Sequence, residues 1–409
     1  MLKVLKNLKN SWASVLVIII LLCVQAATDL ALPDYTSKIV NVGIQYGGIE
    51  EAAPEVIGQE DMENLLFFTD NDEQILENYE LVDGNPTSYQ EKVVKQYLGK
   101  EYNTDENEVY VLKDLDEEQL DSLVSLIAEP LVEYSMGGDV AQMSDSIKEQ
   151  AAISAIKQVY INLGVDTDKL QNDYILMSGL QMLGIALISM LCAVTIMLLS
   201  SRVAAKLGKN LRDKVFKKVL SFSTAELREF STASLITRST NDIQQIQQLI
   251  AILFRVVIYA PIIGIGGFVK VLTSTDYSMA WIIGVAIVAI LFVVGTLFIV
   301  AMPRFRRLQD LIDKLNQVSR EILTGLPVIR AFNKEKKEEE RFDKSNKDLM
   351  KTNVFVNRAM SMMMPLLMFI MSSITVLIVW VGAHNVDAGT LQVGDMMAFI
   401  QYTMQIVMA

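Results

Sequence analysis

The sequence predicts an all-α polytopic membrane protein of six spans. It also predicts long cytoplasmic helical hairpins and a small α/β or helical extracellular domain between the first and second spans. Although its net charge is −12, the 409-residue chain is 51% hydrophobic. The charge is also segregated, because residues 41–170 hold 29 acidic and 7 basic side chains, a net charge of −22, and the rest carries +10. This pattern excludes a single soluble globular domain and a nucleic-acid binder with a basic face.

Five segments are apolar over the ~20 residues that a helix needs to cross the hydrocarbon core. They are residues 12–32, 174–199, 249–269, 280–302 and 359–383. A sixth apolar segment begins near Met396 and reaches the last residue, Ala409, with no polar flank. We therefore expect a truncated last span and a natural polypeptide that continues. The first segment is too long for the apolar core of a signal peptide, which indicates an uncleaved span.

The distribution of lysine and arginine predicts the orientation of the spans. Residues 202–242 hold 9 basic and 4 acidic side chains, and residues 304–358 hold 14 and 9. Both segments are therefore expected inside, with the lysine-rich N-terminus. We predict a multi-pass protein of the plasma membrane with a cytoplasmic N-terminus and residues 41–171 extracellular. The predicted divisions are 1–40 for the N-terminus and first span, 41–171 for the acidic domain, and 172–409 for spans two to six.

The two inner segments have the pattern of helical hairpins, 202–248 and 303–358. In each, apolar side chains at helical spacing continue the preceding span. These side chains are Val203, Leu207, Leu211, Val215 and Val219 in the first hairpin, and Leu308, Leu311, Leu315, Val318 and Ile322 in the second. Ser223 is an expected N-cap for a short helix over 224–230. Glycine and proline at 324–327 predict that the second descending helix ends there, with a return helix from about Asn333.

The acidic segment has its own signals of structure. Residues 108–112 alternate like a strand, and Asp116 with Gln119 resembles a capping box that opens a helix over 117–131. A second helix is expected over 147–163, ended by Gly164. The function of this domain stays open between binding, restriction of an outer gate and no binding role.

A few residues of the spans are candidates for function. Arg255 is either a cation of a substrate cavity or a side chain that extends to the inner headgroups. Met363, Met364 and Met368 are either part of an adaptable substrate pocket or ordinary packing. Asp29 is placed at the outer end of the first span, where interfacial solvation explains it. The two cysteines and the single histidine have no metal-ligand spacing, and no metal site is predicted.

Several stretches together resemble the transmembrane half of six-span ATP-binding cassette (ABC) exporters. They are Leu32-Pro33 with Lys38-Ile39-Val40, residues 230–242, Glu321-x-x-x-Gly325-x-x-Val328-Ile329-Arg330-Ala331-Phe332, Arg341-Phe342, and Gly394-Asp395-x-x-Ala398-Phe399. The chain departs from that pattern at Ser234, where glycine is frequent, and in its long first outer segment. It also lacks the phosphate loop G-x-x-x-x-G-K-[ST] of an ATPase.

The resemblance implies that the hairpin tips are coupling helices that contact nucleotide-binding domains. The first would comprise Ser223, Thr224, Ala225, Glu226, Leu227 and Arg228, and the second Leu326, Pro327, Val328, Ile329, Arg330 and Phe332. The hairpin motif would comprise Arg238, Asp242, Glu321 and Gly325. Arg238 and Asp242, four residues apart, are spaced to pair.

The expected function is that of a membrane subunit of an ATP-driven exporter that works by alternating access. The resemblance implies a second transmembrane subunit, in a homo- or heterodimer, and a nucleotide-binding domain that follows in the chain or is a separate one. ATP and Mg²⁺ would bind there, so no enzyme activity is expected of this chain. An ion-coupled secondary transporter is an alternative, although such proteins carry carboxylates near the middle of the membrane. A membrane sensor with an extracellular ligand-binding domain is another.

Overall fold

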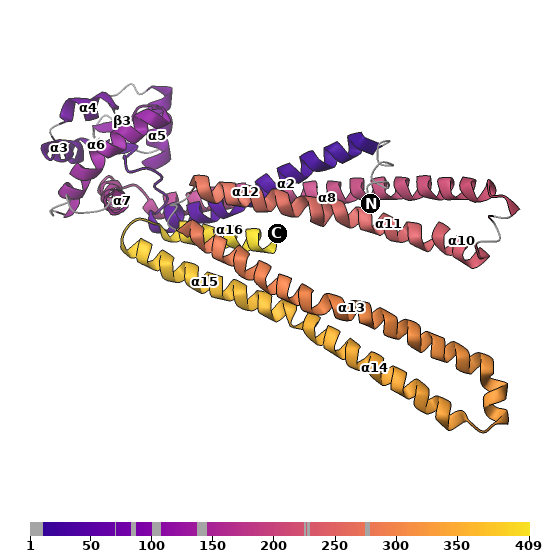
Figure 1. Cartoon of the computed structure of the whole chain (residues 1–409). Helices are drawn as coiled ribbons and strands as arrows, with labels where there is room; N and C mark the ends of the chain where they lie inside the picture. The colour runs from indigo at the N-terminus through magenta and orange to yellow at the C-terminus, as the bar shows by residue number, and fades with distance from the viewer. Residues whose placement is uncertain are drawn as a thin grey trace. The chain divides into compact units, whose positions relative to one another are not determined.

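The computed structural model describes residues 11–69, 71–82, 87–99, 108–136, 145–224, 226, 230–274 and 279–409. It divides into two compact units, one of residues up to 277 with 381–409, and one of residues 278–380. Figure 1 shows their elements. Within these described residues, five helical segments are long and apolar enough to cross a membrane, which confirms the first five predicted spans. They are Trp12–Gln45, Thr167–Leu220, Thr232–Thr273, Ala280–Ala331 and Glu335–Asp387.

The acidic domain is defined here as residues 46–166. Of the two predicted alternatives, α/β or helical, it has the α/β fold. Its elements are β1 (Val56–Gly58), α3 (Gln59–Phe67), α4 (Asp72–Glu77), β2 (Tyr79–Val82), α5 (Ser88–Tyr97), β3 (Val109–Leu112), α6 (Glu117–Met136) and α7 (Asp145–Asn162). The strands form an antiparallel sheet in the order β1-β3-β2. The predicted strand and both helices are present. The capping box also forms, since Gln119 N donates to Asp116 Oδ1 at 2.9 Å and Asp116 N to Gln119 Oε1 at 3.3 Å.

Alternation along β3 separates two apolar clusters in this domain. Val109 and Val111 pack with Val56 on one face of the sheet, near α5. Leu112 faces the larger cluster, to which α6 contributes Ile127 and α7 contributes Tyr160. Because successive side chains of a strand point to opposite faces, a short valine-rich strand serves both clusters.

Continuous helices join the acidic domain to the membrane-spanning helices. Helix α2 (Trp12–Lys38) continues as the π-helical η2 (Ile39–Gln45), and α8 (Thr167–Leu220) starts directly after the domain. Tyr46 and Val165, which flank these helices, are buried in the core of the domain. Gln171 Nε2 of α8 also donates to the carbonyl of Gly43 at 2.8 Å. The domain is therefore rigidly mounted on the ends of α2 and α8.

The first helix extends beyond the apolar segment 12–32, because α2 continues through Pro33 to Lys38. A proline inside a helix leaves the carbonyl four residues earlier without its backbone donor. Here that carbonyl belongs to Asp29, and Gln405 Nε2 of α16 (Val393–Met408) donates to it at 3.1 Å. A side chain from another helix thus replaces the missing hydrogen bond.

The membrane-spanning part of the first unit is a bundle around α2. Helix α2 contacts α8, α12 (Tyr259–Ser274) and α16, while α10 (Thr232–Ser239), α11 (Asn241–Ile252) and η4 (Leu253–Ile258) lead into α12. The predicted apolar stripe of α8 begins in this core, where Val203 and Leu207 are buried with Phe254. Helix α16, the expected sixth span, has 16 residues.

The second unit is a hairpin of α13 (Ala280–Ala331) and α14 (Glu335–Ser361), followed by the part of α15 (Met363–Asp387) up to residue 380. The predicted stripe of α13 is confirmed, with Val318 buried and its other four members half-buried. The predicted helix end at 324–327 was wrong, because α13 continues through Gly325 and Pro327. The carbonyl that Pro327 leaves free is that of the exposed Leu323, where solvent can hydrate it. Figure 1 shows the last turns of α13 bending at this point.

Candidate functional site

The tip of the first hairpin is closed by a capping box and a pair of aromatic rings. Glu226 N donates to Ser223 Oγ at 3.3 Å and Ser223 N donates to Glu226 Oε2 at 2.8 Å, as expected for an N-cap at Ser223. The hydrogen bonds that the backbone N–H and the hydroxyl of Ser223 donate to the Glu226 carboxylate hold the pKa of that group below its usual range. Phe222 and Phe230 stack at 5.6 Å between ring centroids across the tip. Of the predicted first coupling helix, Thr224 is helical, whereas Ala225, Leu227 and Arg228 lie outside the described residues.

Arg238 contacts this tip, but not through the ion pair with Asp242 that the spacing of four residues suggested. In the described part of the chain it forms no salt bridge with Asp242, because α10 ends at Ser239 and the backbone of Thr240 interrupts the helix. The Arg238 guanidinium instead lies 5.3 Å from the ring centroid of Phe230, a cation–π contact. The aromatic closure and the arginine therefore belong to one cluster.

The tip of the second hairpin is the end of α13 and not a separate helix. Asn333 has φ +49°, and its N–H donates to the carbonyl of Arg330 while that of Lys334 donates to Ile329. This is a Schellman motif, in which asparagine takes the left-handed position. The predicted second coupling segment, residues 326–332, thus forms the last helical turns, with Val328 and Phe332 exposed. An exposed phenylalanine at a hairpin tip is available for contact with another domain.

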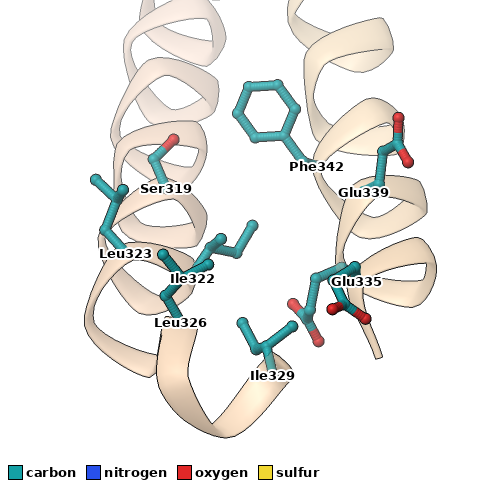
Figure 2. Close-up of a pocket in the computed structure, with 9 residues that line it drawn as sticks. Ser319, Ile322, Leu323, Leu326, Ile329, Glu335, Glu339 and Phe342 are labelled. Atoms are coloured by element: carbon teal, nitrogen blue, oxygen red, sulfur yellow. The ribbon is translucent and has the colours of Figure 1, made fainter. Parts of the chain in front are cut away.

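A cavity of about 450 Å³ lies inside this tip, between α13 and α14. Figure 2 shows Ile322 and Leu326 of α13 facing the space into which Phe342 of α14 projects. Three glutamates of the first turns of α14 also line it: Glu335, Glu338 and Glu339.

An ion pair ties the two arms of this hairpin together. Arg341 of α14 lies 2.6 Å from Glu321 of α13 and 3.3 Å from Glu338 of its own helix. The hydrogen bond from Arg341 holds the pKa of the Glu321 carboxyl below its usual range. Glu321 and Arg341 belong to two separate stretches of the predicted family pattern, and the structure brings them together. The other hairpin-motif residue, Gly325, lies one turn below Glu321 in α13.

A polar junction pins the start of α16 to α2 and η2. Its members are Ser37, Asn41, Gly394 and Asp395. Ser37 Oγ donates to Asp395 Oδ1 at 2.6 Å, Asn41 Nδ2 donates to the same oxygen at 3.2 Å, and Gly394 N donates to Asn41 Oδ1 at 2.7 Å. A Cβ on Gly394 would lie 2.6 Å from the carbonyl oxygen of Ser37. The close approach of the two helices therefore requires glycine at position 394. Asp395 accepts the hydrogen bonds that join the helices.

Glu149 of α7, in the acidic domain, interacts electrostatically with Asp395 of this junction. Burial, and then the charge of Asp395, raise the pKa of the Glu149 carboxyl. Burial, and then the charges of Glu149 and Asp395, raise the pKa of the Tyr46 phenol, which accepts a hydrogen bond from Gln392 Nε2 at 2.7 Å. Three elements thus meet here: α7, the end of η2 and the segment before α16.

The raised pKa of Glu149 predicts a pH dependence of stability. Its protonated form is favoured in the folded state, so this contribution is complete below the ordinary carboxyl pKa and is lost as pH rises through the raised value. At neutral pH the folded state therefore bears the cost of the charge. We expect Glu149→Gln to raise the thermal midpoint by about 1–2 °C at neutral pH, a gain that disappears in acid. A shift of equal size in the exposed control Glu118→Gln, or a gain independent of pH, would contradict this.

Asp29, predicted at the outer end of the first span, contacts residues near the middle of the second and third predicted spans. Ser189 Oγ of α8 donates to its Oδ1 at 2.5 Å, the hydroxyl of Tyr259 donates to its Oδ2, and Gln25 Nε2 lies 3.5 Å from Oδ2. Tyr259 lies ten residues from either end of the predicted third span, 249–269. A charged carboxylate at that level costs ~3 kcal/mol in an isolated helix, which hydroxyl donors partly offset.

The substrate-cavity candidates are not brought together by any observed contact. Arg255 is exposed on η4 in the first unit. Met364 and Met368 are exposed and Met363 is half-buried on α15 in the second unit. Since each unit is described by itself, both assignments remain predictions.

Sequence reasoning missed the polar junction, and it undervalued Asp29. The signal at Asp29 was Pro33, four residues later, which frees the Asp29 carbonyl for a partner outside the helix. No local signal pointed to Ser189 or Tyr259, because their contacts with Asp29 join residues far apart in the sequence.

These features define a class, that of polytopic helical membrane proteins with two long polar hairpins. The family follows from a comparison with family models, in which residues 146–409 match the ABC transporter transmembrane region. The chain belongs to this family. The match begins within α7, so most of the acidic domain lies outside it.

Curated relatives agree with this assignment. The chain is 34% identical over 233 residues to an uncharacterized ABC transporter ATP-binding protein of Mycobacterium tuberculosis, a match covering 56% of this chain and 40% of that protein. It is 29% identical over 260 residues to an uncharacterized ABC transporter ATP-binding protein of Bacillus subtilis, covering 63% and 45%. It is 23% identical over 210 residues to an ATP-dependent lipid A-core flippase of Pseudoalteromonas translucida, covering 50% and 35%. The chain thus spans less than half the length of these relatives.

Proposed function

We propose that this chain is the membrane-spanning part of an ATP-driven exporter that moves its substrate by alternating access. In this proposal the hairpin tips at 223–230 and 326–332 contact nucleotide-binding domains. The observation that carries it is the length of the hairpin arms. Helices α8 and α13 have 54 and 52 residues, about 80 Å each at ~1.5 Å per residue, against a hydrocarbon core of ~30 Å. Arms of this length can convert movement at the tip into movement of a span.

The proposed partners are a nucleotide-binding domain and a second transmembrane subunit. Two of the relatives are named ATP-binding proteins. The matched part of this chain covers 40% of the length of one and 45% of the length of the other. ATP and Mg²⁺ are therefore assigned to a domain that either continues the chain or is a separate protein. The ATP-dependent lipid A-core flippase among the relatives supports ATP as the energy source. A homo- or heterodimer would complete the pathway.

The proposed location is the plasma membrane, with the acidic domain outside. Its mounting on α2 and α8 and its contact with the start of α16 support a role linked to outer-gate movement. A domain held by three helix ends should shift whenever those ends change position. We propose that its orientation changes with the transport cycle.

Asp29 weakens one argument against the ion-coupled alternative, since it lies at the level where such transporters carry carboxylates. The family assignment favours ATP as the energy source. ATP-dependent transport that persists when ion gradients are collapsed by ionophores is expected, whereas its complete loss would favour ion coupling. A sensor would not require the two long hairpins.

The ion pair between the hairpin arms provides a test of the lever. In the assembly with its nucleotide-binding domain, Glu321→Arg and Arg341→Glu should each lower the substrate transported per ATP hydrolysed, because like charges then face one another across the arms. The double variant restores opposite charges and should recover most of this ratio. Unchanged ratios in both single variants, measured by parallel transport and ATPase assays, would contradict a rigid lever.

A further inference from the structure

Asp29 is held by neutral groups alone. Its hydrogen-bond donors are two hydroxyls, of Ser189 and Tyr259, and the more distant amide of Gln25. Among the residues that the structure describes, no lysine, arginine or histidine pairs with it. An ionised carboxylate has about four acceptor positions, so these donors leave both acceptor capacity and an uncompensated negative charge.

A second carboxylate on the same helix shows the contrast. Asp34 Oδ2 lies 2.8 Å from Lys270 Nζ of α12, and the hydroxyl of Tyr402 donates to Asp34 Oδ1. The bundle therefore neutralises one acidic group of α2 with a lysine and leaves the other without a cation. An asparagine at position 29 could also bond both hydroxyls, accepting from one at its Oδ1 and donating to the other from its Nδ2, without the cost of a charge. A purely structural role thus explains the hydrogen bonds but not the charge.

A buried acceptor without a donor belongs to the same neighbourhood. Gln405 Nε2 donates to the main-chain carbonyl of Asp29 at 3.1 Å, which fixes the orientation of the amide. Its Oε1 is then buried without a hydrogen-bond partner among the described residues. Such groups are rare, and they indicate an absent partner. A partner that donates hydrogen bonds and carries positive charge suits both Asp29 and this oxygen.

We propose that Asp29 and Gln405 form a subsite of the transport pathway that binds the ammonium group of a cationic amphiphile. This inference rests on the proposed export function. An ammonium group has N–H donors and no acceptor, which matches a carboxylate and an amide oxygen. A metal ion suits the site less, since the described residues contain no group of three acidic, cysteine or histidine side chains. The apolar part of the ligand would lie among the surrounding spans.

The test uses the assembly with its nucleotide-binding domain in liposomes without charged lipids. The probes are phenylalkylamines of increasing chain length, with the alcohols and carboxylates of equal length as neutral and anionic controls. Half-maximal stimulation of ATP hydrolysis is measured for wild type, Asp29→Asn and Asp34→Asn. Asp34→Asn is the matched control, because it also removes a carboxylate of α2, but one that already has a lysine partner.

We expect the wild type to respond to the best amine at about tenfold lower concentration than to its alcohol, as for one charged contact. Asp29→Asn should lose this preference, whereas Asp34→Asn should keep both the preference and its ATP hydrolysis without probe. An equal response to amine and alcohol in the wild type, including no response to either, would overturn the proposal. So would an amine preference that survives in Asp29→Asn. Loss of probe-free ATP hydrolysis in Asp29→Asn would assign this residue to folding and also overturn it.

These outcomes test the subsite and do not depend on the measurement that tests the proposed export function. The preference for amines compares variants within one assembly, whereas ATP-driven export is tested by the ratio of transport to ATP hydrolysis in the hairpin variants. An exporter without amine preference would refute the subsite alone. Amine binding without ATP-driven transport would refute the export function alone.

Discussion

Replacing Gly394 with alanine should destabilise the protein, although alanine usually stabilises a helix. Gly394 lies in the first turn of α16, where glycine is ~1 kcal/mol less favourable than alanine on helix propensity alone. Its added Cβ would lie 2.6 Å from the carbonyl oxygen of Ser37, which belongs to the backbone of α2. A backbone oxygen cannot rotate away, so the helices must separate. The hydrogen bond from Gly394 N to Asn41 would weaken with them.

We expect Gly394→Ala to cost about 1–3 kcal/mol of stability and to lower transport through disorder at the start of α16. The matched control is Gly184→Ala in α8, where the added Cβ meets no atom within 4 Å. That variant should be neutral or more stable by up to ~1 kcal/mol. Thermal unfolding of the two purified proteins measures the difference. Equal midpoints, or a higher midpoint for Gly394→Ala, would show that the close approach of α2 and α16 does not form.

Placing a charge at Phe332 should uncouple ATP hydrolysis from transport. This side chain is 71% exposed at the end of α13, directly before the Schellman motif. An exposed aromatic ring at a rigid helix end is suited to an apolar pocket of a partner domain. Phe332→Glu would require burial of an unpaired carboxylate in that pocket, which costs several kcal/mol. The helix itself should be unaffected, because the ring supports no part of it.

We expect Phe332→Glu to lower the transport-to-ATP ratio by at least about tenfold, with the protein folded and inserted. Met350→Glu is the matched control, since Met350 is an exposed apolar residue on α14 of the same hairpin, 18 residues along the chain from Phe332. It should leave the ratio within about twofold of wild type. An undiminished ratio in Phe332→Glu, or an equal loss in both variants, would remove the coupling role of the second tip.

The sequence predicted those features of the membrane-spanning part that depend on one helix alone. Apolar length located the first five spans, and helical spacing located the buried stripes of α8 and α13. The capping boxes at Asp116 and Ser223 were also accessible, since a cap depends on residues only three apart. Local rules predicted these features because local interactions determine them.

Local rules failed at Pro327, where solvent replaces the hydrogen bond that proline removes, and they gave no sign that a tertiary contact does the same at Pro33. In α2 the replacement comes from Gln405, more than 370 residues away in the chain. The sequence did not predict the functional clusters, for the same reason. Ser37 with Asp395, Asp29 with Tyr259, and Glu321 with Arg341 each join elements that only the folded chain brings together. The residue types were visible in the sequence, but their partners were not.

Site-specific cross-linking from the second hairpin tip tests the central claim of coupling most directly. Its background is Cys23→Ser with Cys192→Ser, which removes both native thiols. A photoreactive group on Phe332→Cys, in the assembly with its nucleotide-binding domain, is activated with and without ATP, with Met350→Cys as control. We expect position 332 to cross-link to the nucleotide-binding domain and position 350 not to. Cross-links from position 332 to lipid or to the same chain alone would contradict it.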